Sequence, residues 1–245
     1  MAFSYLIQSL AVFALAALGG YFLLPFFLAR EKLHFYISHS TNLEAAWRDR
    51  ALKFLTDRMG FISPNAVTII GFLLVGVLSF LFLKEASFQA IFWFTLAAGF
   101  TDMLDGSLAR NNRQVTKIGA VLDWSRDLLL AVVVGFFIVR LGLLPLWLFL
   151  WFFVGWFFLG LVRFFELKVS SGKIFSPDED FKFALDRVRL ALAWYGVLIL
   201  LSVPYNAALG RAAEALIIIS IAFSWLSLLF HSAHLRFLKE EKTGP

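Results

Sequence analysis

The sequence predicts an all-α protein that crosses a membrane several times. Hydrophobic residues make up 60% of the 245 residues and charged residues 16%, whereas a soluble domain is nearer half apolar and a quarter charged. Apolar runs of about 20 residues recur along the chain, and this length matches the hydrocarbon core of a bilayer. We therefore expect a polytopic membrane protein whose six-helix transmembrane core follows an additional N-terminal span and an amphipathic helix at the membrane surface.

Residues 1–29 form the first apolar segment. They have no basic N-terminal region and no small-residue cleavage site, which argues against a removed signal peptide. We expect residues 3–29 to span the membrane, with a helix lying in the interface as the alternative.

Residues 30–62 form a juxtamembrane segment of different character. Thr41 and Glu44 fit a capping box. From Leu43 to Leu55, apolar residues recur at helical spacing with basic residues between them. This pattern is typical of an amphipathic helix on an anionic membrane surface; a helix packed on the rest of the protein is the alternative.

The core, residues 63–238, begins with Ser63 as a helix N-cap and Pro64 at the first helical position. The first four of its six expected spans cover residues 64–83, 87–110, 117–140 and 143–165. The fifth is a helix that starts at Ser176-Pro177 and ends near Val203, and the sixth covers residues 211–235. Residues 239–245 form a basic tail. Since no repeat or low-complexity linker separates the spans, we expect one domain.

Basic residues alternate between rich and poor loops. Four loops are rich in basic residues: the segment before residue 64, the loop from Arg110 to Lys117, the loop from 163 to 189, and the segment after 235. The intervening loops contain one basic residue each. By the positive-inside rule, the rich loops face the cytoplasm. This accounts for the net charge of +5 without a nucleic-acid partner. We expect the plasma membrane of a bacterium or an archaeon. The chain has no cysteine, which excludes disulfides and thiolate chemistry.

Four aspartates meet at the cytoplasmic ends of the second and third core spans. Asp102 and Asp105 are three residues apart and Asp123 and Asp127 four, so each pair shares one face of a helix. The short loop 111–116 joins two antiparallel helices and brings these faces together. A carboxylate near lipid costs several kcal/mol unless it is paired or binds a cation, so we expect a functional site here.

The chemistry of these side chains indicates a metal site. Carboxylates without a neighbouring histidine or cysteine are hard oxygen ligands, suited to Mg²⁺, Mn²⁺ or Ca²⁺. Four negative charges balance two divalent ions, and two-metal sites suit displacement at phosphorus.

Small and basic residues surround the aspartates. Gly106 and Gly119 lie one turn from them and admit either a ligand or a closely packed helix. Arg110, Arg113 and Lys117 supply cations that hold phosphate, or that only orient the helices.

Two other classes compete with this interpretation. Intramembrane aspartates also line ion paths in transporters and channels, but such sites lie near the midplane, often at broken helices. These aspartates lie at one edge beside a basic loop. A catalytically silent scaffold is the second alternative, and the intact set of aspartates argues against it. His231 and His234 supply too few ligands for a metal, and we expect them to be interfacial side chains.

The pattern D-x-x-D-G-x-x-A-R-x8-G-x3-D-x3-D, from Asp102 to Asp127, resembles the signature of the CDP-alcohol phosphotransferase family. The segment from Pro64 to Thr68 is similar to a secondary feature of that family. The resemblance implies a membrane enzyme of phospholipid synthesis that transfers a phosphatidyl or related group from a CDP-linked donor to an alcohol and releases CMP. It also implies a homodimer.

The resemblance assigns roles to residues of this chain. Asp102, Asp105 and Asp123 would hold two divalent cations, Mg²⁺ or Mn²⁺. Asp127 would complete that site and act as the general base on the acceptor hydroxyl. The CDP part would bind to Asn65, Thr68, Asp102, Gly106, Ala109, Arg110 and Gly119.

The acceptor has a separate set of expected contacts. Family members that use glycerol phosphate or inositol phosphate often have a basic residue directly after the last aspartate, where this chain has Leu128. We expect CDP-diacylglycerol as donor and a small phosphorylated polyol, such as glycerol 3-phosphate or inositol phosphate, as acceptor. A non-phosphorylated or lipid acceptor is the alternative, in which case the basic residues of the fifth span only anchor its end. The expected acceptor contacts are Arg113, Lys117, Arg126, Arg187 and Arg189.

Overall fold

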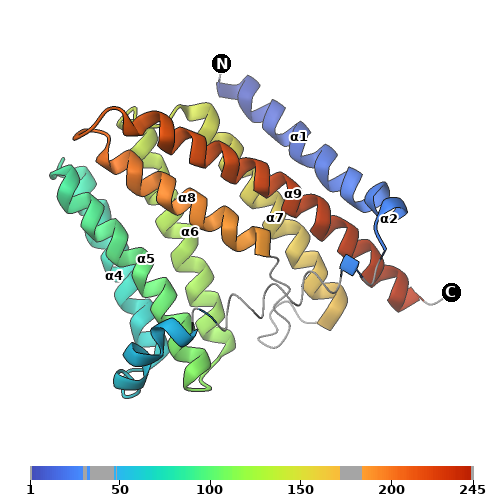
Figure 1. The fold of residues 1–245 in the computed structure, drawn as a ribbon, viewed down its shortest axis with the longest axis horizontal. Coiled ribbons are helices and arrows are strands. Elements are labelled where there is room, and N and C mark those ends of the chain that lie inside the picture. The colour runs from blue at the N-terminus through green and yellow to red at the C-terminus, as the bar shows by residue number, and fades with distance from the viewer. Residues whose placement is uncertain (1, 30–31, 34–46, 48, 172–183, 244–245) are drawn as a thin grey trace. The chain divides into compact units, whose positions relative to one another are not determined.

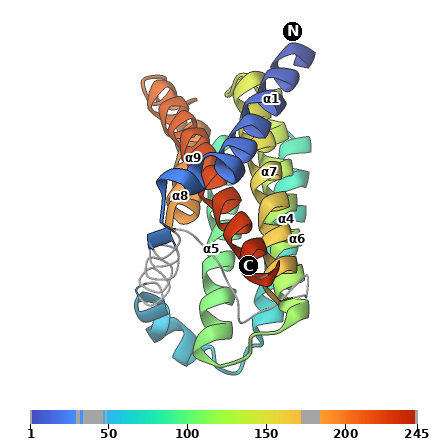
Figure 2. The same ribbon diagram turned by 90° about the vertical axis from the view of Figure 1, so that its right-hand side faces the viewer.

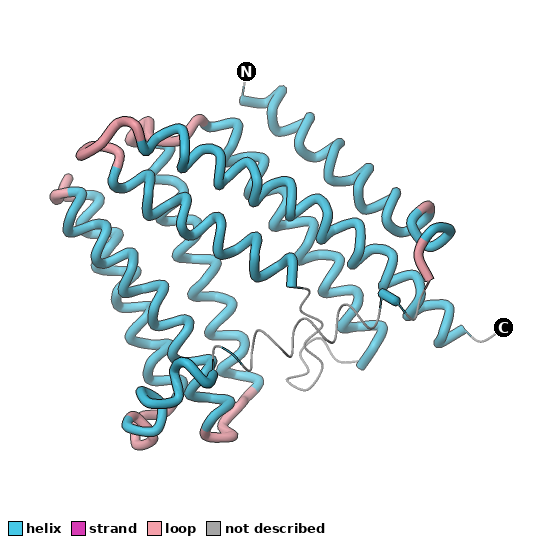
Figure 3. The backbone as a smooth tube through the Cα atoms, viewed as in Figure 1, coloured by secondary structure: helices cyan, strands magenta, loops and turns pink. Residues whose placement is uncertain are grey.

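The structure is a computed structural model that describes residues 2–29, 32–33, 47, 49–171 and 184–243. In this described part all regular secondary structure is helical, so the predicted all-α class is confirmed (Figure 1). The helices are α1 Ala2–Phe22, α2 Leu24–Phe27, α4 Pro64–Leu83, α5 Phe88–Asn111, α6 Lys117–Arg140, α7 Leu146–Ser171, α8 Ala184–Ser202 and α9 Leu209–Thr243. Short loops join consecutive helices from α4 to α7, as the tube in Figure 3 shows.

Four helices in the described part are long and apolar enough to cross a membrane. Their apolar stretches are Phe3–Phe22 in α1, Pro64–Leu83 in α4, Leu146–Glu166 in α7 and Leu209–Lys242 in α9. The predicted membrane class is therefore confirmed. Helices form at the other predicted spans as well, but α5 and α6 carry acidic and basic residues and the apolar part of α8 is shorter. That these three also cross the membrane stays a prediction.

The N-terminal apolar segment is broken rather than continuous. The sequence predicts one span over residues 3–29, but α1 ends at Phe22 and the short α2 begins at Leu24. Pro25 lies in the first turn of α2. Its ring would clash with a carbonyl of the preceding turn, and it has no N–H to donate, so the helix stops before it.

The C-terminal helix is longer than predicted. The sequence predicts a span that ends near residue 235 and a tail over residues 239–245, but α9 continues to Thr243. An ion pair between Arg236 Nε and Glu240 Oε1, 2.7 Å apart and one turn along the helix, supports this extension.

Two predicted helix starts, at Thr41 and at Ser176, lie outside the described residues. Residues 47 and 49–58 of the juxtamembrane segment are helical. The exposed Trp47 and Phe54 agree with an amphipathic helix.

The chain divides into two compact units, each made of separate stretches. One unit contains Met1–Leu43, Pro145–Gly196 and Ala213–Pro245, and the other contains Glu44–Leu144 and Val197–Ala212. All four aspartates belong to the second unit.

In the second unit, α4 packs against both α5 and α6 (Figure 1). Serine and threonine hydroxyls cap the three helices: Ser63 accepts from the backbone N–H of Ala66, Ser87 from Ala90, and Thr116 from Gly119. Val67, Leu104 and Leu108 form a buried cluster where α4 meets α5. The Thr116 cap and this apolar cluster fix the ends of α6 and α5 that carry the aspartates, whereas Ser87 caps the opposite end of α5.

In the first unit, α1 packs along α7 (Figure 2). Two glycines permit close approach of helices here. A Cβ on Gly155 would lie 2.6 Å from the ring of Phe13, and a Cβ on Gly20 would lie 2.8 Å from the backbone Cα of Leu229. Small residues at crossings are typical of helices packed in membranes.

Candidate functional site

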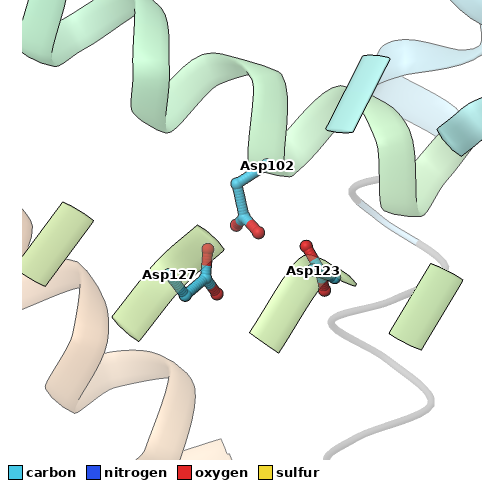
Figure 4. A group of neighbouring side chains, drawn as sticks. All are labelled: Asp102, Asp123 and Asp127. Atoms are coloured by element: carbon cyan, nitrogen blue, oxygen red, sulfur yellow. The ribbon is translucent and has the colours of Figure 1, made fainter. Parts of the chain in front are cut away.

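Three aspartates converge from two helices. α5 carries Asp102 and α6 carries Asp123 and Asp127, and one carboxylate oxygen of each lies within 4.8 Å of the others. Figure 4 shows these carboxylates directed toward a common space. Their side chains are 35% to 42% exposed, so a soluble ligand can reach them.

The fourth aspartate is buried beside them. Only 4% of the Asp105 side chain is exposed. Its Oδ2 atom accepts hydrogen bonds from Thr68 Oγ1 at 2.8 Å and from Arg126 Nη1 at 2.6 Å. Asp105 is therefore held by protein donors and is buried, whereas the other three aspartates are partly exposed.

Arg126 lies inside the aspartate cluster. Its Nη2 donates to the Oδ1 atoms of Asp102 at 2.5 Å, Asp123 at 2.6 Å and Asp127 at 2.9 Å, and its side chain is fully buried. The sequence predicts Arg126 as an acceptor contact. The structure instead surrounds its guanidinium with carboxylates, because Arg126 follows Asp123 by three residues and so points from the same face of α6.

Gly71 of α4 makes room for this arginine. A Cβ at position 71 would lie 2.6 Å from Arg126 Cδ and 2.8 Å from Thr101 Oγ1. The absence of a side chain on α4 therefore allows the arginine to reach the carboxylates of α5.

The donor set suits a divalent cation. Four carboxylates and one guanidinium carry a net charge of −3. Asp102, Asp123 and Asp127 offer hard oxygen ligands, partly exposed and close together, which Mg²⁺ and Mn²⁺ prefer over softer donors. The residues therefore fit such an ion.

Arg110 lies at the end of α5, held by an aspartate of the juxtamembrane helix. Its Nε and Nη2 donate to the two carboxylate oxygens of Asp49 at 2.7 and 2.8 Å. Ser107 Oγ also donates to Asp49, at 2.9 Å, and Asn111 Nδ2 donates to Thr56 Oγ1 at 2.7 Å. Sequence reasoning missed Asp49; the only signal was an acid inside a basic, amphipathic stretch.

Two more predicted nucleotide contacts lie next to each other. A Cβ on Gly119 would be 2.9 Å from the side-chain oxygen of Asn65, so these residues of α6 and α4 adjoin. Gly106 faces the guanidinium of Arg110, which a Cβ would meet at 3.4 Å, and Ala109 is half-buried. The whole predicted CDP set therefore belongs to the unit that holds the aspartates.

Comparison with known proteins decides the family. The family described as CDP-alcohol phosphatidyltransferase matches residues 61–231. The chain belongs to the CDP-alcohol phosphatidyltransferase family. Its members are membrane enzymes of phospholipid biosynthesis that use a CDP-alcohol donor and an alcohol acceptor and that generally depend on divalent metal.

One curated relative matches this chain over a short stretch. An archaetidylinositol phosphate synthase from Pyrococcus horikoshii is 43% identical over 67 residues, which are 27% of this chain and 35% of that protein. No solved structure matches the chain.

The predicted acceptor contacts lie in both units. Arg113 is exposed in the loop after α5, where its φ of 55° helps the chain to reverse. The side chains of Lys117 and Arg187 lie outside the described residues. Arg189, in the other unit, is 2% exposed, and its Nε and Nη1 atoms have no hydrogen-bond partner among the described residues.

The chain also contains a second polar cluster, which the sequence does not predict. His231 Nδ1 lies 2.7 Å from Glu166 Oε2, and its Nε2 lies 3.0 Å from Asp186 Oδ2. His234 Nδ1 lies 2.9 Å from Glu166 Oε1, and Ser227 donates to Asp186. The expectation that both histidines are interfacial is wrong. They are 1% and 0% exposed, because the acids of α7 and α8 draw this face of α9 inward.

Proposed function

We propose that this transferase moves a phosphatidyl group from a CDP-linked lipid such as CDP-diacylglycerol to the hydroxyl of a small phosphorylated polyol, and releases CMP. The observation that carries this proposal is the convergence of Asp102, Asp123 and Asp127 on one solvent-accessible space. This arrangement lies within the matched family region.

The proposed metal site is formed by the same three aspartates. A divalent ion held there, Mg²⁺ or Mn²⁺, supplies positive charge that offsets the charge developing on the diphosphate as CMP leaves. Asp105 and Thr68 act behind the site, by keeping Arg126 and the carboxylates in place.

Asp127 is the proposed general base. A hydroxyl is a weak nucleophile at neutral pH, so a carboxylate that takes its proton assists attack. The acceptor oxygen then forms a bond to the phosphorus of the phosphatidyl group. The bond from that phosphorus to the bridging oxygen of the diphosphate breaks, and CMP departs with that oxygen.

The nucleotide is proposed to bind between the starts of α4 and α6 and the end of α5. Asn65 and Gly119 adjoin there, and the missing side chain at 119 leaves the Asn65 amide approachable. Arg110 presents a guanidinium whose orientation Asp49 fixes, and guanidinium groups bind phosphate oxygens in pairs.

Arg189 remains a predicted contact of a phosphorylated acceptor. It is buried near the charges of Asp186 and Arg163, and its Nε and Nη1 atoms have no hydrogen-bond partner among the described residues. The name of the relative, archaetidylinositol phosphate synthase, favours inositol phosphate among such acceptors.

The orientation, the organism type and the assembly are further parts of the proposal. The basic loops support an aspartate site that faces the cytoplasm of a bacterium or archaeon. The family resemblance supports a homodimer with lipid substrate drawn from the membrane.

An acceptor screen tests the proposal. Purified protein in lipid nanodiscs receives CDP-diacylglycerol, Mg²⁺ or Mn²⁺, and either inositol phosphate, glycerol 3-phosphate, inositol, serine or phosphatidylglycerol. We expect CMP release with a phosphorylated polyol and none in EDTA. Release only with a non-phosphorylated or lipid acceptor would overturn the proposed acceptor class.

Asp127→Asn tests the base. We expect CMP release to fall by about 100-fold or more, because general-base assistance contributes on this order. Asp57→Asn, the same change at an exposed aspartate outside the cluster, is the control and should retain wild-type rates. A rate for Asp127→Asn equal to that of this control would remove Asp127 as base.

A further inference from the structure

Arg126 occupies the position of a cation within the carboxylate cluster. Its Nη2 atom lies 2.5 to 2.9 Å from one oxygen of each of Asp102, Asp123 and Asp127. Its Nη1 atom binds Asp105 at 2.6 Å. A single guanidinium thus contacts all four carboxylates that the sequence offers for metal binding.

The surrounding structure is built to hold this arginine. The side chain is fully buried, and α4 has a glycine where any side chain would overlap Arg126 Cδ. Its Nε atom has no hydrogen-bond partner in the described part of the chain. Burial of a guanidinium is costly without paired charge, so the four carboxylates are what stabilise it there.

The arginine changes the number of ions that the cluster needs. Four carboxylates alone balance two divalent ions, but with Arg126 the net charge is −3, and two divalent ions would make the cluster positive. One oxygen of every carboxylate is also engaged by the guanidinium. The three partly exposed aspartates keep a second oxygen each, and Mg²⁺ usually takes only one or two carboxylates and completes its shell with water and substrate oxygens.

We propose that Arg126 is a permanent internal cation that replaces one of two divalent ions, so that this transferase binds a single divalent ion per chain. The catalytic use of that ion rests on the proposed function. The stoichiometry does not, because it follows from the charges and contacts of the cluster.

The experiment counts bound Mn²⁺. Full-length protein in nanodiscs is treated with EDTA, desalted and titrated with Mn²⁺, and the free ion is measured by its electron paramagnetic resonance signal. We expect one Mn²⁺ per wild-type chain at saturation. Two per chain would overturn the proposal, and so would none, and this count needs no variant.

Substitutions at position 126 test whether the charge of Arg126 sets the number of bound ions. Arg126→Gln removes the charge at similar length, and we expect the count to rise from one to two. Arg126→Lys keeps the charge and should bind one ion. Arg140→Gln, the same change at the exposed end of α6, should also bind one. A folded Arg126→Gln protein, monodisperse by gel filtration, that still binds one ion would contradict the role of Arg126.

Thermal unfolding gives a second readout. When EDTA replaces Mn²⁺, wild type should lose less Tm than Arg126→Gln, since wild type releases one ion and keeps its guanidinium, whereas the variant releases two ions and has no internal cation. An equal shift in both proteins would contradict a permanent internal cation.

CMP release distinguishes a failure of this inference from a failure of the proposed function. Two bound ions together with CMP release from a CDP-linked lipid would remove the inference and leave the proposed function. One bound ion without CMP release from any offered donor and acceptor would remove the proposed function and leave Arg126 as the internal cation.

Discussion

The position of Arg110 depends on Asp49. The two side chains form a bidentate pair, and Ser107 adds a hydrogen bond to the same carboxylate. Asp49 belongs to the juxtamembrane helix and Arg110 to α5, so this pair also joins these two helices within the unit that holds the aspartates. A side chain outside the family signature thus positions one within it.

Asp49→Ala should weaken donor binding. Arg110 would lose the partner that orients its guanidinium, and it is one-third exposed, so the effect is moderate. We expect KM for the CDP-linked lipid to rise about threefold to tenfold, or about 0.7–1.4 kcal/mol, with a smaller change in kcat. Steady-state CMP release measures both constants.

The control for Asp49 is another ion pair of similar length. Glu240→Ala breaks the contact with Arg236 on α9 and should leave KM unchanged. An unchanged KM in Asp49→Ala as well would show that Arg110 does not need this partner for donor binding.

Helix α9 carries a polar stripe through an apolar span. Its members repeat at alternating spacings of four and three residues, which places them on one face; they are Ser220, Ser224, Ser227, His231 and His234. All five are buried. The stripe meets Glu166 of α7 and Asp186 of α8, so polar contacts join three helices that apolar packing alone would leave free to slide.

His231→Ala should destabilise this packing strongly. The substitution leaves Glu166 and Asp186 buried without the imidazole that bridges them, and breaking a buried charged pair typically costs about 3–5 kcal/mol. We expect a clearly lower Tm in detergent. Arg211→Ala, at an exposed position of the same helix, should change Tm little. Equal Tm values for the two variants would mean that the bridge contributes nothing to stability.

The crossing of α1 and α9 offers a matched pair of glycines. A Cβ on Gly20 would overlap the backbone of Leu229, whereas one on Gly19 would only reach ordinary contact, 3.8 Å from the Leu229 side chain. We expect Gly20→Ala to destabilise by about 1–3 kcal/mol through overpacking, and Gly19→Ala to be neutral. Thermal unfolding of both variants checks this, and similar Tm values would show that the helices separate freely.

Much of the helical architecture was predictable because local signals determine it. Apolar length located the helices, and Ser63-Pro64 marked the start of α4. The spacing of the four aspartates predicted that they share faces, and the short loop predicted that those faces meet. The contacts of Arg126 with the carboxylates could not be predicted, because its environment depends on Gly71, which is distant in sequence and adjoins it only in the fold.

The histidines were misjudged for a similar reason. Their partners, Glu166 and Asp186, lie on two other helices, and no local pattern connects them. The 4-3 spacing of serines and histidines along α9 was the available signal, since a regular polar stripe in an apolar helix predicts a buried partner.

The orientation of the whole protein is the prediction that the fold leaves for experiment. Because the chain contains no cysteine, single-cysteine variants have no background. Gln114→Cys lies after α5 beside the basic loop, and Lys84→Cys lies before α5, and both positions are exposed. By the positive-inside rule, a membrane-impermeant maleimide should label Gln114→Cys only in inside-out vesicles and Lys84→Cys only in right-side-out vesicles.

The labelling pattern tests two claims separately: that the aspartate site faces the cytoplasm, and that α5 crosses the bilayer. The reverse pattern would place the aspartate site outside the cell, where cytosolic CDP-linked substrate could not reach it. Labelling of both cysteines from the same side would show that α5 does not cross the bilayer. In that case Asp105 and Arg126 would lie at a depth where water, rather than lipid, sets the free-energy cost of their charges. The carboxylates would then depend less on a guanidinium to compensate their negative charge.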